Sequence, residues 1–107
     1  MVMTDDRVDD QELHNVLAHA LHGWSKSENA LERTFELADF KAALTFINEL
    51  GEHAEEMGHH PDVDLRYNKV KLRLTSHDVG GITRRDLRLA EQAETIAHRH
   101  HPVRKTA

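Results

Sequence analysis

The change of apolar spacing near residue 58 is the feature that most constrains the fold of this 107-residue chain. From Phe40 to Met57 apolar residues recur every three or four positions and form one predicted apolar stripe, as in an amphipathic helix: Phe40, Ala43, Leu44, Ile47, Leu50, Ala54 and Met57. Gly58 suits the position that ends a helix, and Pro61 then favours an extended chain. Over residues 63–74 apolar and polar residues alternate, apart from a bend near the middle. A long helix followed by two half-buried strands is therefore the predicted centre of the fold.

The residues before this centre predict another helix and another pair of strands. The apolar spacing predicts a helix that begins after Asp9 and stops at Gly23. A strand that opens at Trp24, a turn over 25–29 and an alternating strand over 31–37 predict a hairpin. The chain thus begins with the order helix, strand, strand, which the next half repeats.

A third helix closes the pattern. Thr83 is its predicted N-cap, and Asp86 stands at the third helical position, where an acidic side chain completes a capping box. The complete order is helix, strand, strand, helix, strand, strand, helix. We expect an α+β fold, a four-stranded antiparallel sheet with three helices packed on one face. One domain is predicted over 9–99, between a flexible N-terminus (1–8) and a flexible basic tail (100–107).

Composition excludes several classes of protein. The chain has no cysteine, which rules out disulfides and cysteine-based zinc sites. Its formal net charge of −5 disfavours direct binding of nucleic acid through a basic surface. No apolar run approaches the roughly 20 residues that span a membrane, and no signal-sequence pattern precedes the first helix, so we expect a cytoplasmic protein. Uncovered sheet edges predict a homodimer or homotetramer.

Three histidines are the candidate chemical groups. His59 and His60 follow the long helix, and His77 follows the second predicted hairpin. Because the two arms of that hairpin are nearly equal in length, the chain should return His77 to the neighbourhood of His59. Glu55 lies one helical turn before His59, and Asp86 is expected to reach the same corner. Imidazole exchanges protons near neutral pH, so this grouping predicts acid–base chemistry.

Two other interpretations of the histidines remain open. Loop histidines are often solvent-exposed residues without a function. A metal site is a second alternative, but adjacent side chains such as His59 and His60 point in different directions on an extended chain. Histidines in a frayed tail do not form a preformed site either. We therefore expect no metal.

A longer motif resembles a known family. It comprises Glu55-x3-His59-His60-Pro61-Asp62, Tyr67-Asn68-Lys69-Val70, His77, Gly81 and Asp86, with further similarity at Gly23-Trp24 and Asp39-Phe40. This pattern resembles the pterin-4a-carbinolamine dehydratase family over about residues 10–97. The resemblance implies a hydro-lyase that needs no cofactor and converts 4a-hydroxytetrahydropterin into quinonoid dihydropterin. That reaction serves to recycle the tetrahydropterin of aromatic amino acid hydroxylases.

The resemblance also implies a catalytic role for the three histidines. It implies that His59 and His77 act as an acid–base pair on opposite sides of the pterin ring. It implies that His60 holds and orients the ring. Animal members of the family also act as dimerisation cofactors of a transcription factor, so the alternative is a non-catalytic dimerisation or assembly cofactor on the same fold.

Four further residues complete the expected site. By the same resemblance, Glu55 and Asp86 fix the tautomers of the imidazoles, and Arg85 contacts the ligand. Pro61 is expected to bind the substrate or to support the residues that do. Val63 departs from the family pattern, because many members carry an aromatic residue there, so one wall of the site is expected to be more open.

Overall fold

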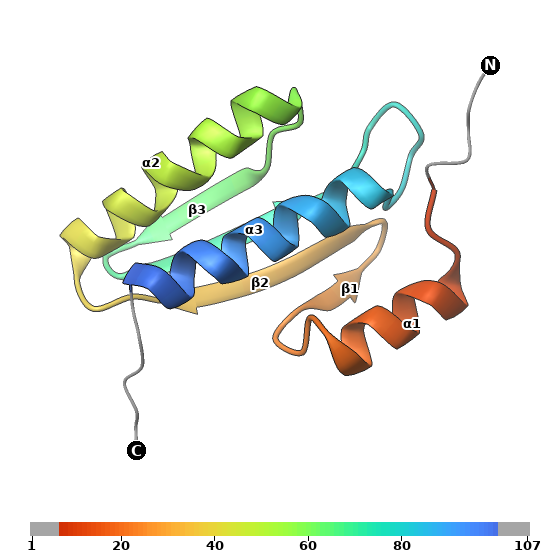
Figure 1. Cartoon of the computed structure of the whole chain (residues 1–107), viewed down its shortest axis with the longest axis horizontal. Coiled ribbons are helices and arrows are strands. Elements are labelled where there is room, and N and C mark those ends of the chain that lie inside the picture. Colours follow the sequence, from red (N-terminus) through yellow and green to blue (C-terminus); the bar gives the residue numbers. More distant parts are fainter. Residues whose placement is uncertain (1–6, 101–107) are drawn as a thin grey trace.

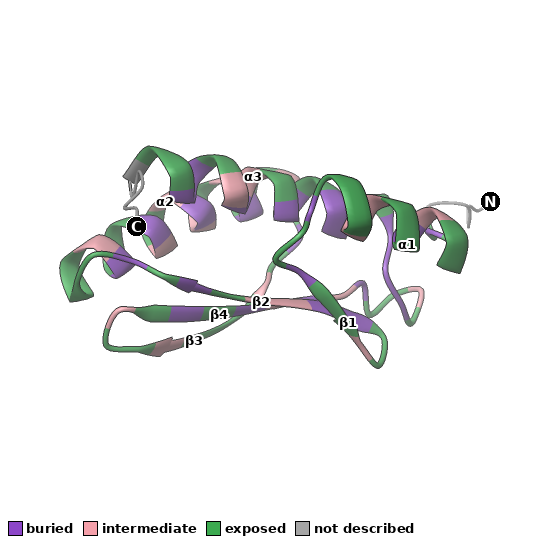
Figure 2. Ribbon diagram, turned by 90° about the horizontal axis from the view of Figure 1, so that it is seen from below, coloured by how far each residue is buried: buried purple, intermediate pink, exposed green. Residues whose placement is uncertain are grey.

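A computed structural model describes residues 7–100. Its elements are α1 (Asp10–His19), β1 (Ser25–Ser27), β2 (Ala30–Glu36), α2 (Phe40–Met57), β3 (Asp62–Arg66), β4 (Lys69–Leu74) and α3 (Arg84–His100). All strand pairs are antiparallel, and their order in the sheet is β1-β2-β4-β3. The three helices lie on one face of this sheet (Figure 1; Figure 2). The predicted α+β fold and its order of elements are therefore confirmed.

The core lies between the sheet and the helices (Figure 2). Alternation along β4 turns Val70, Leu72 and Leu74 inward, and each is at most 1% exposed. Apolar side chains of α2 and α3 cover them, notably Phe46 and Ile96, both fully buried. The outer face of the sheet carries ion pairs instead, such as that between Arg73 of β4 and Glu32 of β2 at 2.5 Å.

The helix ends follow the sequence signals. Asp39 caps α2 by accepting a hydrogen bond from the backbone N–H of Ala42 at 2.8 Å. Gly58 ends α2 in the left-handed conformation, with φ of 63°. At the start of α3, the Thr83 N–H donates to the Asp86 carboxylate at 2.9 Å, as predicted for a capping box.

The first hairpin differs from its prediction. Residues 25–27 form strand β1 and pair with 30–32 of β2, so the turn contains only Glu28 and Asn29. Glu28 takes a positive φ of 58° and closes this short turn without glycine. The predicted strand opening at Trp24 is wrong by one residue, and the predicted turn over 25–29 is too long. Serine and lysine have low strand propensity, but pairing with β2 decides the conformation here.

The apolar stripe of α2 is wider than the face that it buries. Phe46 is fully buried and belongs to the core, although the predicted stripe did not include it. Phe40 and Leu44, which the stripe did include, are 46% and 40% exposed. Val63 of β3 is 43% exposed. These side chains leave an exposed apolar face beside the edge strand β3.

The packed domain includes residues before position 9. Val8 is buried, and its backbone N–H donates to the Ile82 carbonyl at 3.0 Å. The predicted flexibility of the ends concerns mainly residues 1–6 and 101–107, which lie outside the described residues. Within the described part, no helix combines the length and apolar character needed to cross a membrane.

Candidate active site

The left-handed turn at Gly58 separates the two adjacent histidines. The backbone N–H of His59 donates to the Ala54 carbonyl at 3.0 Å, which completes the end of α2. His59 is buried, with 8% of its surface exposed, whereas His60 is exposed. One imidazole therefore enters the protein interior and its neighbour faces solvent.

The buried imidazole contacts a buried carboxylate. His59 Nε2 lies 2.5 Å from Asp86 Oδ1, and Asp86 has no exposed surface. The other oxygen, Asp86 Oδ2, accepts hydrogen bonds from Ser76 Oγ and from the Thr83 backbone N–H, both at 2.9 Å. A buried carboxylate is costly unless hydrogen bonds replace its lost hydration. Here the residue after the turn that ends α2, the loop after β4 and the start of α3 supply the donors.

Strand register explains why these residues meet. In the β3–β4 hairpin, Asp62 pairs with Arg73. Continuing this register for three more positions places His59 opposite Ser76. The inward parity of Leu72 and Leu74 on β4 also continues to Ser76, which is 1% exposed. The next residue, His77, must then face the other way, and it is exposed.

His77 lies in a short loop over residues 76–81. Arg85, in the first turn of α3, holds this loop through Nη2, which lies 3.1 Å from Asp78 Oδ1 and 3.2 Å from Oδ2. The hydrogen bond from Arg85 lowers the pKa of the Asp78 carboxyl. Ser76, the first residue of this loop, binds the Asp86 carboxylate that contacts His59, so the loop adjoins the buried pair.

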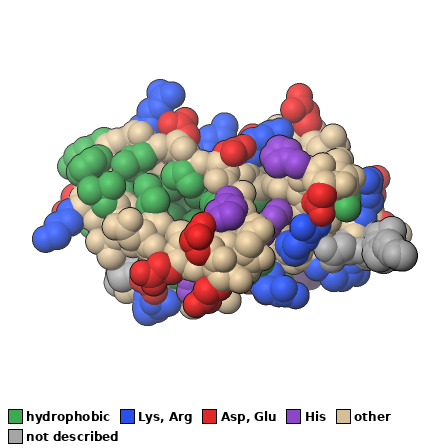
Figure 3. All heavy atoms as spheres, turned by 90° about the horizontal axis from the view of Figure 1, so that it is seen from above, with side chains coloured by type: hydrophobic (Ala, Val, Ile, Leu, Met, Phe, Trp, Pro, Cys, Tyr) green, Lys and Arg blue, Asp and Glu red, His purple; other side chains and the backbone are tan. Residues whose placement is uncertain are grey.

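His60 belongs to a neighbouring groove. Its Nε2 lies 2.6 Å from Glu55 Oε2. The sequence placed Glu55 beside His59 instead, but the turn at Gly58 directs His59 inward and leaves His60 to meet the helix end. Both residues line an open groove of about 880 Å³ between α2 and β3, together with Pro61 and Val63. Figure 3 shows histidine side chains beside a hydrophobic patch on this face.

The predicted site residues thus fall into two adjoining groups. The first comprises His59, Asp86 and the loop that carries His77, with Arg85 attached to that loop through Asp78. The second comprises His60, Glu55 and Pro61 along the groove. His59 and His77 are not among the lining residues described for this groove. Neighbouring positions 59 and 60 join the two groups.

Sequence reasoning missed three residues of the first group. Ser76 binds Asp86 through its hydroxyl, Thr83 binds Ser76, and Asp78 binds Arg85. A signal for Ser76 was present, because the inward alternation of β4 reaches it and a polar side chain there needs a partner. Asp78 gave no signal, since its partner is set by the path of the loop.

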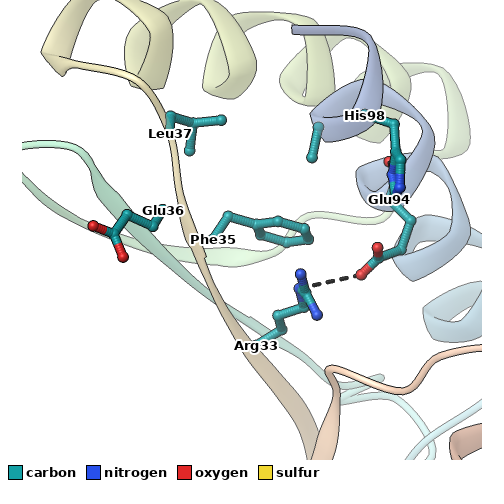
Figure 4. Close-up of a pocket in the computed structure, with 7 residues that line it drawn as sticks. Arg33, Phe35, Glu36, Leu37, Glu94 and His98 are labelled. Atoms are coloured by element: carbon teal, nitrogen blue, oxygen red, sulfur yellow. Dashed lines mark hydrogen bonds and ion pairs between the residues drawn. The ribbon is translucent and has the colours of Figure 1, made fainter. Parts of the chain in front are cut away.

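A second hollow lies away from these groups. It has a volume of about 200 Å³ and lies between β2 and the last turns of α3 (Figure 4), and its walls are Arg33, Phe35, Glu36, Leu37, Glu94, Ala97 and His98. None of the predicted site residues lines it. Among residues 7–100 there is no group of three or more histidine, aspartate or glutamate side chains that could hold a metal ion.

Comparison with known proteins places the chain among relatives of similar length. The protein named "Putative pterin-4-alpha-carbinolamine dehydratase" of Koribacter versatilis is 46% identical over 87 residues, which are 81% of this chain and 92% of the relative. The protein of the same name from Thermomicrobium roseum is 43% identical over 91 residues, covering 85% and 97%.

Solved structures have the same fold. A transcriptional coactivator/pterin dehydratase from Brucella melitensis superposes with a TM-score of 0.81 at 33% identity, over 85% of this chain and 98% of that one. A pterin dehydratase-like RuBisCO assembly factor of the alpha-carboxysome superposes with a TM-score of 0.58 over 69% and 86%, at 17% identity. The latter similarity concerns the fold alone.

The family model described as pterin 4 alpha carbinolamine dehydratase matches residues 6–96. That match covers both groups of site residues and every helix and strand described above except the last four residues of α3. This match and the two relatives confirm the resemblance that the sequence motif indicated. The chain belongs to the pterin-4a-carbinolamine dehydratase family.

Proposed function

We propose that the protein is a hydro-lyase that dehydrates 4a-hydroxytetrahydropterin to quinonoid dihydropterin, with His59 as its central proton-transfer group. One observation carries the assignment to His59. Its imidazole is buried against the fully buried Asp86, next to the exposed loop that bears His77. An imidazole oriented by a carboxylate at the edge of a surface is the arrangement that general acid–base catalysis requires.

The reaction needs two proton transfers. The C4a–O bond breaks, and because hydroxide is a poor leaving group, an acid must protonate the oxygen so that water departs. The C4a=N5 bond forms from the electron pair of the N5–H bond, and a base must accept that proton. The products are quinonoid dihydropterin and water, and the two protons balance between acid and base. A positioned group contributes roughly 10²–10⁴-fold to each transfer.

Asp86 determines which nitrogen of His59 exchanges protons. A carboxylate only accepts hydrogen bonds, so Nε2, the nitrogen 2.5 Å from Asp86 Oδ1, carries a proton. In the neutral imidazole Nδ1 is then the free base. We propose that Nδ1 of His59 and the ring of His77 serve as the two proton carriers.

The second group of residues is proposed to bind the pterin. Glu55 holds the His60 ring at the mouth of the groove. We propose that His60 orients the flat heterocycle while Pro61 packs beside it. Arg85 of α3 is proposed to contact the ligand beside the His77 loop. In the structure its guanidinium binds Asp78 of that loop. The exposed Val63 leaves this side of the groove open.

The physiological setting follows as part of the same proposal. The product is the substrate of a reductase step that regenerates tetrahydropterin, so the enzyme is proposed to act in cytoplasmic pterin recycling. A homodimer or homotetramer is proposed as the working form. Phe40 and Leu44 of α2 provide its contact surface, because each is at least 40% exposed beside the edge strand β3.

A non-catalytic assembly role is the second candidate. It rests on the same exposed apolar face and on the fold shared with the RuBisCO assembly factor. This alternative gives no reason for the buried pair of His59 and Asp86, which makes the enzyme the stronger proposal. This alternative predicts that substitution of His59 leaves the assembly activity of the protein unaffected.

Dehydration of chemically generated 4a-hydroxytetrahydropterin, followed by absorbance, tests the proposal. Wild-type protein should accelerate the reaction over buffer. His59→Ala and His77→Ala should each lower kcat by roughly 10²–10³-fold, whereas His60→Ala should mainly raise KM. The exposed His14 on α1 provides the matched control, and His14→Ala should keep the wild-type rate. A wild-type rate equal to that of buffer contradicts the proposal.

A further inference from the structure

We infer that Ser76 is a positioning residue that fixes the carboxylate of Asp86 and, through it, the tautomer of His59. This inference deepens the proposed function and rests on it. Ser76 lies between the end of β4 and the loop that carries His77. It therefore connects the buried acid–base pair with the exposed histidine.

Burial makes these hydrogen bonds hard to replace. Ser76 is 1% exposed, and Thr83 and Asp86 have no exposed surface. Water does not reach groups buried to this extent without a cavity, so a lost donor leaves Asp86 Oδ2 with one partner fewer. The hydroxyl of Ser76 is thus a specific part of the site.

Counting hydrogens sets the direction of the hydrogen-bond chain. Ser76 has one hydroxyl proton, and the charged Asp86 Oδ2 at 2.9 Å is its strongest acceptor. The contact of 2.8 Å between Ser76 Oγ and Thr83 Oγ1 must then use the proton of Thr83. Thr83 Oγ1 in turn accepts from the backbone N–H of Arg85 at 3.2 Å. Each proton of the chain points toward Asp86.

This direction leaves Asp86 only an acceptor role. Its Oδ2 already receives the protons of Ser76 and of the Thr83 backbone. Its Oδ1 therefore takes the Nε2 proton of His59, which frees Nδ1 for the substrate. Without the Ser76 hydroxyl, Asp86 Oδ2 keeps only the Thr83 N–H as a donor. The carboxylate can then rotate, and His59 is no longer held in the single Nε2–H tautomer.

The backbone of Ser76 has a separate task. Its N–H donates to the Gly81 carbonyl at 2.9 Å, and its carbonyl accepts from the Gly80 N–H at 2.9 Å. These bonds close the loop that bears His77. A substitution at Ser76 that removes only the hydroxyl keeps this loop closure, so the effect of the side chain can be measured by itself.

The test is Ser76→Ala, measured in two ways. Long-range ¹⁵N–¹H spectra of the His59 ring report its tautomer, and steady-state assays report kcat and KM. We expect the single Nε2–H tautomer of wild type to become a mixture, and kcat to fall by roughly 10–100-fold with little change in KM, as for other outer partners of a functional side chain.

Two variants serve as controls. Thr75→Val removes the neighbouring hydroxyl, which binds the Asn29 carbonyl at 2.6 Å and has no contact with Asp86, so it should keep the wild-type tautomer and kcat. Ser76→Thr keeps the hydroxyl and should retain both properties. If Ser76→Ala does not fold, Ser76→Cys replaces it, because its shape is similar and its S–H is only a weak donor.

A folded Ser76→Ala protein with wild-type kcat and a single Nε2–H tautomer overturns the inference. So does equal loss in Ser76→Ala and Ser76→Thr, because shape and not the hydroxyl would then be decisive. The spectra do not depend on turnover. If the wild-type protein lacks dehydratase activity, the proposed function fails while the tautomer of His59 still decides whether Ser76 positions it.

Discussion

Two carboxylates of α3, Asp86 and Glu94, tie this helix to the rest of the domain in different ways. Asp86 is fully buried and contacts His59 at 2.5 Å. Glu94 keeps 23% of its side chain exposed, accepts from Trp24 Nε1 at 2.8 Å and pairs with Arg33 at 3.2 Å. The two carboxylates are eight residues apart, or about 12 Å along the helix.

The partner decides what each carboxylate can do. A guanidinium is always charged in a protein, so the pair of Glu94 and Arg33 exchanges no protons and acts as a structural contact. An imidazole gains and loses a proton near neutral pH, so the pair of Asp86 and His59 can take part in proton transfer. Two similar carboxylates on one helix thus serve stability in one place and chemistry in the other.

The Glu94 cluster also depends on close packing. The guanidinium of Arg33 lies 4.3 Å from the centre of the Phe35 ring (Figure 4). It also lies against Gly23, where an added Cβ would fall 1.2 Å from Arg33 Nη1. Although Nε of Arg33 is close to Glu94, it is not aligned for a hydrogen bond and has no other partner among the described residues. Packing and charge, more than directed hydrogen bonds, hold this cluster.

The largest expected difference between the two regions concerns stability. Asp86→Ala removes one partner of a buried pair and leaves the donors of His59, Ser76 and Thr83 unpaired. We expect the free energy of unfolding to fall by about 3–5 kcal/mol. Glu94→Ala should cost less, because the side chains of Glu94 and of its partner Arg33 are 23% and 27% exposed, so water can replace part of the lost contact. Urea denaturation of both variants measures this, and a larger loss at Glu94 contradicts the ranking.

A smaller effect is expected at Gly23. Gly23→Ala forces the Arg33 guanidinium away from its place, and overpacking of this kind costs about 1–3 kcal/mol. Because the Glu94 cluster is structural, kcat should stay at the wild-type value. Gly51→Ala is the control, since nothing lies within 4 Å of its added Cβ in the middle of α2, and it should not destabilise the protein. A thermal melt of each variant and an activity assay of Gly23→Ala check both expectations.

The smallest effect concerns the loop of His77. Because Arg85 lowers the pKa of Asp78 below its ordinary value of 3.8, this ion pair stabilises the folded state above that value. The contribution is lost as the pH falls through the lowered pKa. The melting temperature of Asp78→Asn should therefore lie slightly below that of wild type at about pH 7 and meet it at about pH 2. A difference that grows toward low pH contradicts this sign.

Much of the fold follows from local sequence patterns. Helical and alternating spacing located the three helices and strands β2, β3 and β4, and Asp39, Gly58 and Thr83 marked helix ends that the structure confirms. The first strand was predicted to open at Trp24, but residues 25–27, which form β1, were assigned to a turn, because their conformation is set by pairing with β2. The prediction was correct where contacts within a segment decide its conformation. It failed at β1, where pairing with another strand decides it.

The candidate site was less accessible to the same reasoning. Hairpin geometry predicted that His77 returns near His59, and the structure binds the preceding residue, Ser76, to the Asp86 carboxylate that contacts His59. The expectation that Asp86 reaches this corner is confirmed. The pairing of Glu55 was wrong, because helical spacing does not describe side-chain direction after the left-handed turn at Gly58. Trp24 and Glu94 are seventy residues apart in sequence, and their contact depends on the packing of α3 across the sheet.

The most direct test compares kcat of Asp86→Asn with kcat of Glu94→Gln. Both substitutions keep the size of the side chain and remove its charge. If Asp86 sets the proton position of the catalytic imidazole, Asp86→Asn lowers kcat by roughly 10²–10⁴-fold, while Glu94→Gln remains close to wild type. Equal kcat values for two folded variants would contradict the assignment of His59 and Asp86 as the acid–base centre.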